Sequence, residues 1–502
     1  MESLTFVYTM RRQILMLLDG PIVPVYALRL TEQLRNELDC SVTFQAIPHQ
    51  TSKITRLPSH WKPDLLENST ETTIQSRTTE DSAPNLVIDF RSSPDHLINT
   101  CPVIRCDFFA HARSWEFPSL VHSIIKSRPI IELQMILQAA GNHEGKCIQT
   151  AQIPVTLHQY RRSLNRILSE SIRLILRSAM LVLTNSEQEV IQTEKTEPSS
   201  TNFTPFRIRI SILKHQIKHR YRQFTSTDVW NIAKVELPIQ HLALGQSNHI
   251  EKTSWMKEPT RGSFQADPFA ILGKDKNDIV LFEYYTQGRG SIVISAENRL
   301  LLSGVHFSYP YTVEHEGAHY VLPENQISGR LVLHKLNSEI SGIEKSYNLL
   351  DHFHAVDPSL VFFEKRWWLF CTDASDKGAD IRLHVFYSES LTGPFFPHFK
   401  NPVKTDIRSA RPAGHLFIHE GKLYRPAQDS SKSYGGSIRI HRIDTINPSD
   451  FSETCINTLV PQQFGNTYTA GIHTLSICGD HCYIDGKRTR RGLFSPFKTA
   501  RK

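Results

Sequence analysis

The sequence predicts an α/β domain at its N-terminal end and an all-β, five-bladed propeller at its C-terminal end. The α/β prediction rests on short apolar segments of strand character that alternate with helical segments over residues 1–190. The propeller prediction rests on a hairpin pattern that recurs five times over residues 231–502. Residues 191–230 are polar and show no apolar period, so we expect a linker between the two domains.

The N-terminal domain is predicted from the order of its apolar segments. Residues 13–18 read as a short buried strand, residues 24–38 have helical spacing, and residues 41–46 alternate as a strand does. Residues 85–90 are again apolar throughout, which is typical of a buried strand in a parallel sheet. A long helix is predicted from residue 160 to about residue 190. This order indicates an open parallel sheet with helices.

The propeller repeats share one pattern. A short polar motif, with proline in four of five copies, opens an apolar strand; a charged turn follows, and a second strand carries aromatic residues. The motifs are Ala266–Phe269, Ser308–Tyr311, Val356–Ser359 and Ala410–Ala413, with a weaker copy from Ala470. A single hairpin cannot bury its apolar face alone, so the copies must stack on one another. The segment from Trp230 onward is predicted to be a lead-in or closing strand.

Each second strand of the repeat ends in an acidic residue. These acids are Glu283, Glu324, Asp373, Asp429 and Asp485. In a propeller the first strand of each blade lines the central channel. The opening motifs and the acids are therefore expected to gather at one mouth of that channel, which is the predicted active region.

Composition indicates an ordinary soluble globular protein, with 39% hydrophobic and 21% charged residues. No apolar run reaches the length of a membrane span, and the N-terminus lacks the order of a signal peptide. The eight cysteines are scattered along the chain, which fits a reducing compartment. We therefore expect a cytoplasmic protein.

The net charge of +7 bears on possible partners. We expect no nucleic acid partner, because no stripe of aromatic and basic residues accompanies the charge. The basic end of the chain, residues 487–502, is predicted to be solvated, and a weak contact with anionic lipid headgroups is the alternative. The oligomeric state does not follow from the sequence.

Cys478 and Cys482, with His473 nearby, are the residues that come nearest to a zinc pattern. Their spacing differs from that of a zinc knuckle, and the sequence has no second pair. We therefore expect a β-turn at this place and no metal.

Taken together, the ordered motifs resemble a known family. Besides the four proline motifs, they include Pro323-Glu324, the run that ends the third copy at Phe370, and the segment Tyr424–Gly436. The C-terminal region resembles the N-terminal domain of the glucosamine inositolphosphorylceramide transferases and, more distantly, the arabinanase-like glycoside hydrolases. This resemblance implies a five-bladed propeller that acts on carbohydrate.

The N-terminal domain resembles the formyltransferases in a degenerate form. That family has an Asn-x-His motif and a downstream aspartate, whereas this chain has Phe109-Ala110-His111, and His143 stands where the acid is expected. The run His158–Arg166 follows, as it does in the family. The resemblance implies a formyltransferase-like fold that is inactive, so we expect no formyl-tetrahydrofolate cofactor and a structural role for His111.

Three acids are the candidates for catalysis. Sugar chemistry needs two carboxyl groups in different protonation states about one anomeric carbon. The resemblance to the arabinanase-like enzymes implies that Asp267 is the general base and that Asp357 orients the reacting groups, and Glu324 is the best candidate for the acid. The alternative is that each aspartate simply caps the turn opened by its Asp-Pro step.

Other residues are candidates for substrate binding. Arg408, Arg411 and Arg425 are permanent cations suited to a phosphate or carboxylate, although they could instead neutralise Asp429 and its neighbours. Gln428 and Asp429 could bind sugar hydroxyls, and Tyr309 could stack on a sugar ring.

We therefore predict a carbohydrate-active enzyme, a glycosyltransferase with a glycoside hydrolase-like propeller. It would move a sugar from an activated donor, such as a sugar nucleotide, to a glycolipid or another cell-surface precursor. One alternative is a propeller that binds sugar or serves as a scaffold without catalysis. The other is an N-terminal domain that formylates an amino sugar.

Overall fold

The computed structural model describes residues 12–18, 25–38, 40–46, 84–90, 101–109, 117–141, 144–184, 204–245, 250, 253–273, 275, 277–295 and 298–492. The chain divides into two compact units, residues 1–219 and residues 220–502. Each unit is described by itself. Among the described residues, no helix is both long and apolar enough to cross a membrane.

The N-terminal unit is built on a six-stranded sheet with the order β2-β1-β3-β4-β5-β6. The strands are β1 (Arg12–Leu18), β2 (Cys40–Ala46), β3 (Leu86–Asp89), β4 (Val103–Cys106), β5 (Ile130–Gln138) and β6 (Gly145–Pro154). The strands β1 to β4 pair in parallel, whereas β5 pairs antiparallel with both β4 and β6. The predicted open parallel sheet is confirmed for the three strands that were predicted, whereas β5 and β6, which were not predicted, extend it antiparallel. The connection between β5 and β6 is too short for a crossover, so the two must form a hairpin.

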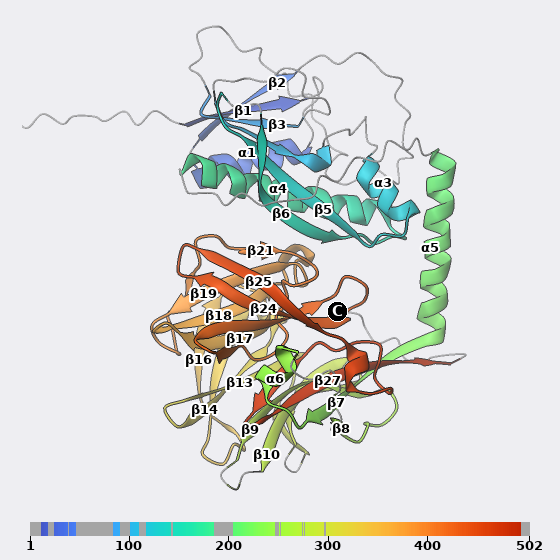
Figure 1. Cartoon of the computed structure of the whole chain (residues 1–502), viewed down its shortest axis with the longest axis vertical. Coiled ribbons are helices and arrows are strands. Elements are labelled where there is room, and N and C mark those ends of the chain that lie inside the picture. The colour runs from blue at the N-terminus through green and yellow to red at the C-terminus, as the bar shows by residue number, and fades with distance from the viewer. Residues whose placement is uncertain are drawn as a thin grey trace, which may run out of the picture. The chain divides into compact units, whose positions relative to one another are not determined.

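Among the described residues of this unit, the helices α1 (Val25–Leu38), α3 (Pro118–Ile125) and α4 (Tyr160–Leu183) accompany the sheet. The helices α1 and α4 contact each other, and α4 also contacts β4 and β6 (Figure 1). The buried face of α4 carries Leu164, Ile167, Leu168 and Ile175, at the three- and four-residue spacing from which the helix was predicted. His111 and His143 lie outside the described residues, so the formyltransferase-like character of this unit stays a prediction.

The linker predicted over residues 191–230 is wrong in its second half. Residues Pro205–Thr225 form the helix α5, and residues Ser226–Val235 form the strand β7. The boundary between the two units falls inside α5. Arginine, lysine and glutamine favour helices, and Ile208 and Ile212 are buried one turn apart. The polar composition concealed that spacing.

The C-terminal unit is a five-bladed β-propeller, as predicted (Figure 1). Blade 1 has β9 (Phe264–Leu272), β10 (Asp278–Thr286), β11 (Arg289–Ile294) and β12 (Arg299–Leu302). Blade 2 has β13 (Ser308–His315), β14 (Ala318–Glu324), β15 (Arg330–Leu336) and β16 (Ile343–Asp351). Blade 3 has β17 (Ala355–Phe363), β18 (Arg366–Asp373), β19 (Arg382–Ser388), β20 (Phe396–Pro397) and β21 (Lys404–Thr405). Blade 4 has β22 (Phe417–His419), β23 (Lys422–Asp429), β24 (Ser437–Ile446) and β25 (Phe451–Leu459).

Blade 5 closes the ring by combining both ends of the unit. The strands β26 (Leu475–Cys478) and β27 (His481–Arg491) pair with β7 and β8 (Thr253–Trp255). The register between β27 and β7 runs without a break from Cys482 opposite Val235 to Arg491 opposite Ser226. The predicted closing strand is therefore β7. The first part of the basic end, predicted to be a solvated tail, is an ordered strand up to Arg491.

Three of the proline motifs distort their blades in the same way. The pairing of the first strand with the second shifts at Asp267-Pro268, at Tyr309-Pro310 and at Asp357-Pro358. Each residue before the proline has a left-handed φ, of 51°, 48° and 48° respectively. Such bulges redirect side chains, and left-handed conformations of residues other than glycine concentrate at functional sites. Blades 1, 2 and 3 thus present Asp267, Tyr309 and Asp357 in equivalent positions.

Candidate active site at the channel mouth

The three predicted catalytic acids are linked by hydrogen bonds that run from blade to blade. The backbone N–H of Tyr309 donates to Asp267 Oδ2 (3.2 Å), and the N–H of Asp357 donates to Glu324 Oε2 (3.2 Å). The N–H of Asp267 in turn donates to Asp485 Oδ2 in blade 5 (3.1 Å). Asp267, Glu324 and Asp357 are 6%, 0% and 2% exposed. Each acid therefore joins its blade to the next one.

Two of these acids, Asp357 and Glu324, lie beside the same cation, Arg411. Its Nε and Nη2 donate to Asp357 Oδ2 (2.5 Å) and Oδ1 (3.2 Å), and its Nη2 lies 3.9 Å from Glu324 Oε2. Its Nη1 donates to Asp380 (2.9 Å), and Gln428 Nε2 donates to Asp357 Oδ2 (2.6 Å). We call Asp267, Glu324, Asp357, Arg411 and Gln428 the mouth cluster. It contains five of the nine residues predicted for the site.

Carboxylates outnumber cations in the mouth cluster. Burial raises the pKa of Asp357, and the charges of Glu324 and Asp267 add to that rise, while Arg411 opposes it. Burial also works against the charge of Arg411, but Asp357 and the nearby acids hold the pKa of its guanidinium above the usual value. Arg411 therefore keeps its positive charge, and the surrounding carboxyl groups share that single charge.

His473 extends the cluster into blade 5. Its Nδ1 pairs with Asp485, and its Nε2 lies 3.8 Å from Asp267 Oδ1. Thr474 Oγ1 donates to the same Asp267 oxygen (2.9 Å). Asp267, His473 and Asp485 have ligand atoms within 4.8 Å of one another, so they could hold a cation. The hydrogen bonds from Thr474 and the backbone already engage these carboxylates without one.

Tyr434 covers the solvent side of the cluster, and the sequence analysis did not single it out. The residue is 40% exposed, and its ring lies 5.1 Å from the Arg411 guanidinium and edge-on to His473 at 5.3 Å. Trp230 stacks on His473 at 3.9 Å and meets the Tyr434 ring edge-on at 6.2 Å. A side chain at Gly435, which has a φ of 57°, would meet the Trp230 ring at 2.8 Å. The glycine after Tyr434 was the available signal for this close packing.

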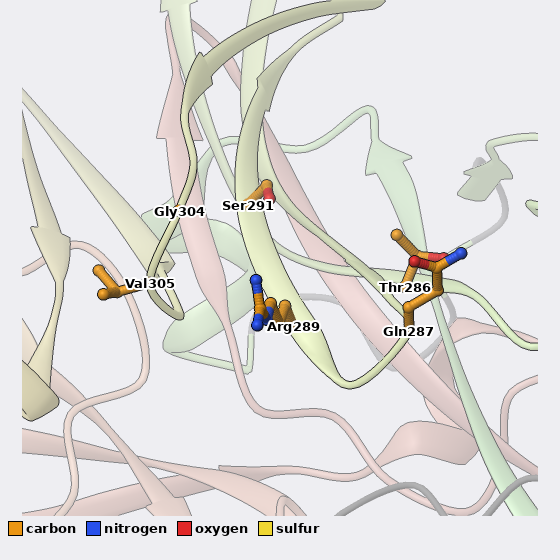
Figure 2. A pocket seen from close by; sticks show the side chains of 6 residues that line it. All are labelled: Thr286, Gln287, Arg289, Ser291, Gly304 and Val305. Carbon is orange, nitrogen blue, oxygen red and sulfur yellow. The ribbon is translucent and has the colours of Figure 1, made fainter.

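A polar pocket of about 470 Å³ opens at the edge of blade 1. Its lining residues are Thr286, Gln287, Arg289, Ser291, Gly304 and Val305, and Figure 2 shows Arg289 between the two sides. Tyr285 pairs with Phe264, three residues before Asp267 on β9. The pocket therefore lies at the same end of blade 1 as the catalytic candidate, where a polar ligand could extend from the mouth.

Three predicted binding residues have their partners elsewhere. Arg408 pairs with Asp406, and Asp429 pairs with Arg439 across β23 and β24. Arg425 is 0% exposed and pairs with Glu453 through its Nε (2.9 Å) and Nη2 (2.6 Å). The alternative, that these arginines neutralise Asp429 and its neighbours, does not hold for Asp429, whose ion-pair partner is Arg439. Arg408 and Arg425 do pair with acids, namely Asp406 and Glu453.

Arg425 belongs to a second buried group, which we call the blade-4 cluster and define as Arg425, Glu453, Lys404 and His441. Lys404 Nζ lies 2.6 Å and His441 Nδ1 lies 3.4 Å from Glu453 Oε1. Although burial opposes it, Arg425 and Lys404 hold the pKa of Glu453 well below its usual range. Burial lowers the pKa of His441 to about 3. The single carboxylate of this cluster is therefore firmly ionised.

Tyr309 does not offer its ring to solvent. The side chain is 0% exposed, its hydroxyl lies 2.9 Å from Ser359 Oγ, and it accepts a hydrogen bond from the Gly414 N–H (2.6 Å). The predicted stacking on a sugar ring is therefore not available to it in this structure. The ring packs across the channel between blades 2, 3 and 4.

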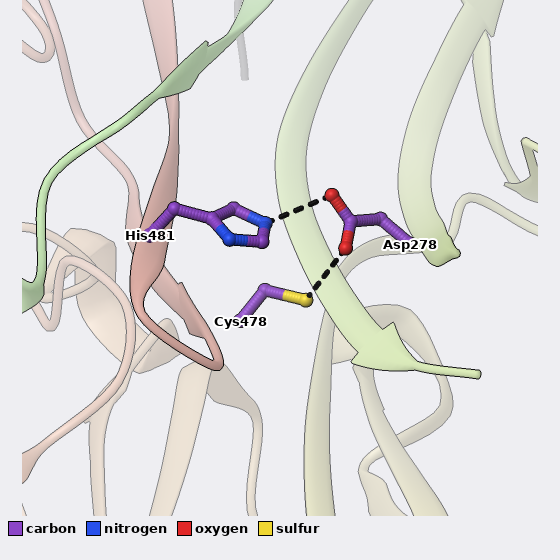
Figure 3. Close-up of side chains that lie close together, drawn as sticks. All are labelled: Asp278, Cys478 and His481. Atoms are coloured by element: carbon purple, nitrogen blue, oxygen red, sulfur yellow. Dashed lines mark hydrogen bonds and ion pairs between the residues drawn. The ribbon is translucent and has the colours of Figure 1, made fainter. Parts of the chain in front are cut away.

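Of the two cysteines considered for zinc, only Cys478 belongs to the group of possible ligands; Cys482 does not. Cys478 and His481 flank the turn between β26 and β27, and they meet Asp278 of blade 1 (Figure 3). Asp278 lies 3.4 Å from Cys478 Sγ and 2.8 Å from His481 Nε2, and Lys234 Nζ lies 3.0 Å from the same carboxylate. Burial raises the pKa of the Cys478 thiol to about 12. With an ammonium group beside the carboxylate, this set is better suited to fastening blade 5 to blade 1 than to holding a cation.

Comparison with known proteins agrees with the predicted resemblance. Residues 297–472 match the family described as glucosamine inositolphosphorylceramide transferase 1, N-terminal. Two curated proteins named glucosamine inositolphosphorylceramide transferase 1 are each 33% identical to the chain. The protein from Oryza sativa subsp. japonica matches over 219 residues, and the protein from Arabidopsis thaliana matches over 153 residues. The resemblance of the propeller to these transferases is confirmed.

The match is partial on both sides. It covers 40% of this chain and 29% of the rice protein, and 30% of this chain and 20% of the Arabidopsis protein. Among solved structures, a thermostable family-43 glycoside hydrolase aligns over 39% of this chain and 76% of the hydrolase chain (12% identity, TM-score 0.30). The Cellvibrio cellulosa α-L-arabinanase complexed with arabinohexaose aligns over 37% of this chain and 76% of the arabinanase chain (14% identity, TM-score 0.29). At this level of likeness the solved structures support no conclusion about activity.

Proposed function

We propose that the propeller is a carbohydrate-active enzyme that transfers a glycosyl group to a glycolipid acceptor at the channel mouth. The observation that carries this proposal is the convergence of Asp267, Glu324 and Asp357 from three blades, linked by hydrogen bonds between blades, with Glu324 and Asp357 beside the single cation of Arg411. The names of the matched relatives point to a glucosamine donor and an inositolphosphorylceramide acceptor.

The roles follow from the environment of each group. Asp267 is the least buried of the three acids and serves as the base that takes the proton of the attacking hydroxyl. The bond from the anomeric carbon to the leaving group breaks as the bond to the acceptor oxygen forms. Glu324 supplies a proton to the leaving oxygen, and Asp357, held by Arg411 and Gln428, orients the site.

The imbalance of charge supports this division. Burial and the neighbouring carboxylates raise the pKa of Asp357, whereas Arg411 lowers it, so this carboxyl group holds its proton more strongly than a free aspartate does. Two carboxyl groups in different protonation states are what glycosyl transfer needs.

A second candidate function is sugar binding without catalysis. It is favoured by the inter-blade hydrogen bonds, because Asp267 and Glu324 each already accept a backbone N–H from the adjoining blade. Asp357 already accepts side-chain hydrogen bonds from Arg411 and Gln428. In that case the carboxylates hold the ring together, and Tyr434 with the polar pocket of blade 1 forms the binding surface.

The two functions are separated by Asp267→Asn. The full chain is incubated with nucleotide-linked glucosamine and vesicles that contain inositolphosphorylceramide, and the glycosylated lipid is measured by mass spectrometry. If Asp267 is the base, the rate falls by about 10²- to 10⁴-fold, while sugar-induced thermal stabilisation persists.

Asp429→Asn is the matched control, because that acid ends the second strand of blade 4, as Glu324 ends that of blade 2, but pairs with Arg439 outside the mouth cluster. Its rate should stay within about twofold of the parent. Equal rates for Asp267→Asn and the parent chain would contradict a catalytic role. A chain that binds sugar but never turns it over would leave the second candidate standing.

A further inference from the structure

The helix α5 carries an apolar stripe that the fold does not cover. Its six members are 49–72% exposed, and they are Phe206, Ile210, Leu213, Ile217, Tyr221 and Phe224. Together they account for a third of the large exposed apolar residues found in the described part of the chain. An uncovered apolar patch of this size marks an interaction surface.

The opposite face of α5 already has its partners in the N-terminal unit. Ile208 and Ile212 are buried, and His215 Nε2 lies 3.0 Å from the Ile124 carbonyl oxygen. His219 stacks on His158 at 4.0 Å between ring centroids. These residues lie about half a turn away from the stripe, so the helix has one docked face and one free apolar face.

The spacing of the stripe fits a flat partner. Phe206, Ile210 and Leu213 recur eleven residues later as Ile217, Tyr221 and Phe224. Eleven residues make close to three full turns of an α-helix, so the stripe drifts by only about 20° and stays nearly straight. A left-handed coiled coil needs two apolar series with a seven-residue period. Ile210, Ile217 and Phe224 form one such series, but Arg220 interrupts the other after Phe206 and Leu213.

Charge decides between a lipid surface and a second copy of the chain. The helix carries six lysines and arginines and has no acidic residue, and the cations are Arg207, Arg209, Lys214, Lys218, Arg220 and Arg222. Arg207 and Lys214 project from one edge of the stripe, and Arg209 and Arg220 from the other. Two such helices would repel each other in either orientation, whereas an anionic surface would attract both edges.

We propose that α5 binds the surface of an anionic membrane, with its apolar stripe buried in the headgroup region and its flanking cations paired with lipid phosphates. Aliphatic and aromatic side chains on one face, with cations at its edges, are what an interfacial helix requires. The helix lies outside residues 297–472, so this inference is independent of the family match and of the proposed glycosyl transfer.

The test is co-sedimentation of the full chain with vesicles of phosphatidylcholine alone or of phosphatidylcholine with about 30% phosphatidylserine. We expect binding to the anionic vesicles only, and weaker binding as salt is raised. The variant Phe206→Ser/Ile217→Ser/Phe224→Ser should lose binding by about a hundredfold or more, because it removes three large apolar groups from the interface. All three positions are more than 60% exposed, so the fold should survive.

Ile327→Ser is the matched control, since this residue is 66% exposed on the propeller and should leave vesicle binding unchanged. Lys214→Glu/Arg220→Glu, which reverses one cation at each edge, should abolish the preference for anionic lipid while leaving the stripe intact. The inference is overturned if the parent chain ignores anionic vesicles, or if the triple serine variant binds them equally well. It is also overturned if light scattering shows that the stripe serves instead to pair two copies of the chain.

Discussion

The propeller contains two buried arginines at matching sequence motifs, and their surroundings have opposite charge balance. Arg425 shares one carboxylate, Glu453, with Lys404, so cations are in excess in the blade-4 cluster. Arg411 faces Asp357, Glu324 and Asp380, so carboxylates are in excess in the mouth cluster. The first arrangement keeps its acid ionised, whereas the second makes its acids compete for one cation. We therefore expect the blade-4 cluster to stabilise the fold, and we propose that the mouth cluster takes part in proton transfer.

Removing the acid of the blade-4 cluster should have the largest effect on stability. Glu453→Gln leaves the positive charges of Arg425 and Lys404 together without a counter-ion, and Arg425 is fully buried. We expect a loss of about 3–5 kcal/mol in the free energy of unfolding, measured by urea titration at pH 7. A loss below about 1 kcal/mol would mean that this cluster contributes little to stability and that the contrast is wrong.

Removing the cation of the mouth cluster should make the free energy of unfolding fall as the pH rises. In Arg411→Met the pKa of Asp357 is raised further, because burial and Glu324 then act unopposed. A carboxyl group whose pKa is higher in the folded state stabilises the fold at low pH, and that stability is lost as the pH rises through the folded pKa. We expect the variant to be destabilised by about 3 kcal/mol at pH 8 and to recover toward pH 5, measured by urea unfolding. A variant that instead loses stability on acidification would contradict the excess of carboxylates.

His415 should contribute an acid-sensitive component that is independent of both clusters. Its Nε2 donates to the Thr312 carbonyl (2.8 Å) and its Nδ1 accepts from the Ile477 N–H (2.9 Å), so the fold holds the neutral ring. Burial lowers its pKa to about 4, against an unfolded value of about 6.5. The stability is therefore complete above about pH 6.5 and falls by up to about 3 kcal/mol as the pH drops to 4.

The measurement is urea unfolding between pH 4 and pH 8. His415→Gln should reduce the slope of stability against pH by about one proton relative to the parent chain. Identical slopes for the two proteins would show that His415 does not titrate on unfolding.

The smallest effect should come from Arg408, which was predicted to bind substrate. It pairs with Asp406 at a partly exposed site, and an ion pair of this kind contributes less than about 1 kcal/mol. Arg408→Ala should therefore leave both the stability and the rate of glycosyl transfer nearly unchanged. A large loss of rate would place this residue back among the binding groups.

The repeats made the convergence of the acids predictable. Asp267 and Asp357 precede proline in phase, and Glu324 ends the second strand of its copy, so closing the ring brings all three to one mouth. The partner of each arginine was not predictable, because Arg425 finds Glu453 on another strand with no local pattern to signal it. His473 and Asp485 became neighbours only through the pairing of blade 5. The helix α5 was missed because its basic composition concealed an apolar period.

The central claim is that the excess of carboxylates in the mouth cluster favours a protonated carboxyl group, whereas the excess of cations in the blade-4 cluster favours an ionised one. Infrared difference spectroscopy of the full chain at pH 7 tests it directly through the carbonyl band of a protonated carboxyl group. We expect such a band in the parent chain, its shift or loss in Asp357→Asn, and no change of it in Glu453→Gln. A parent spectrum in which every buried carboxyl group is ionised would contradict the account.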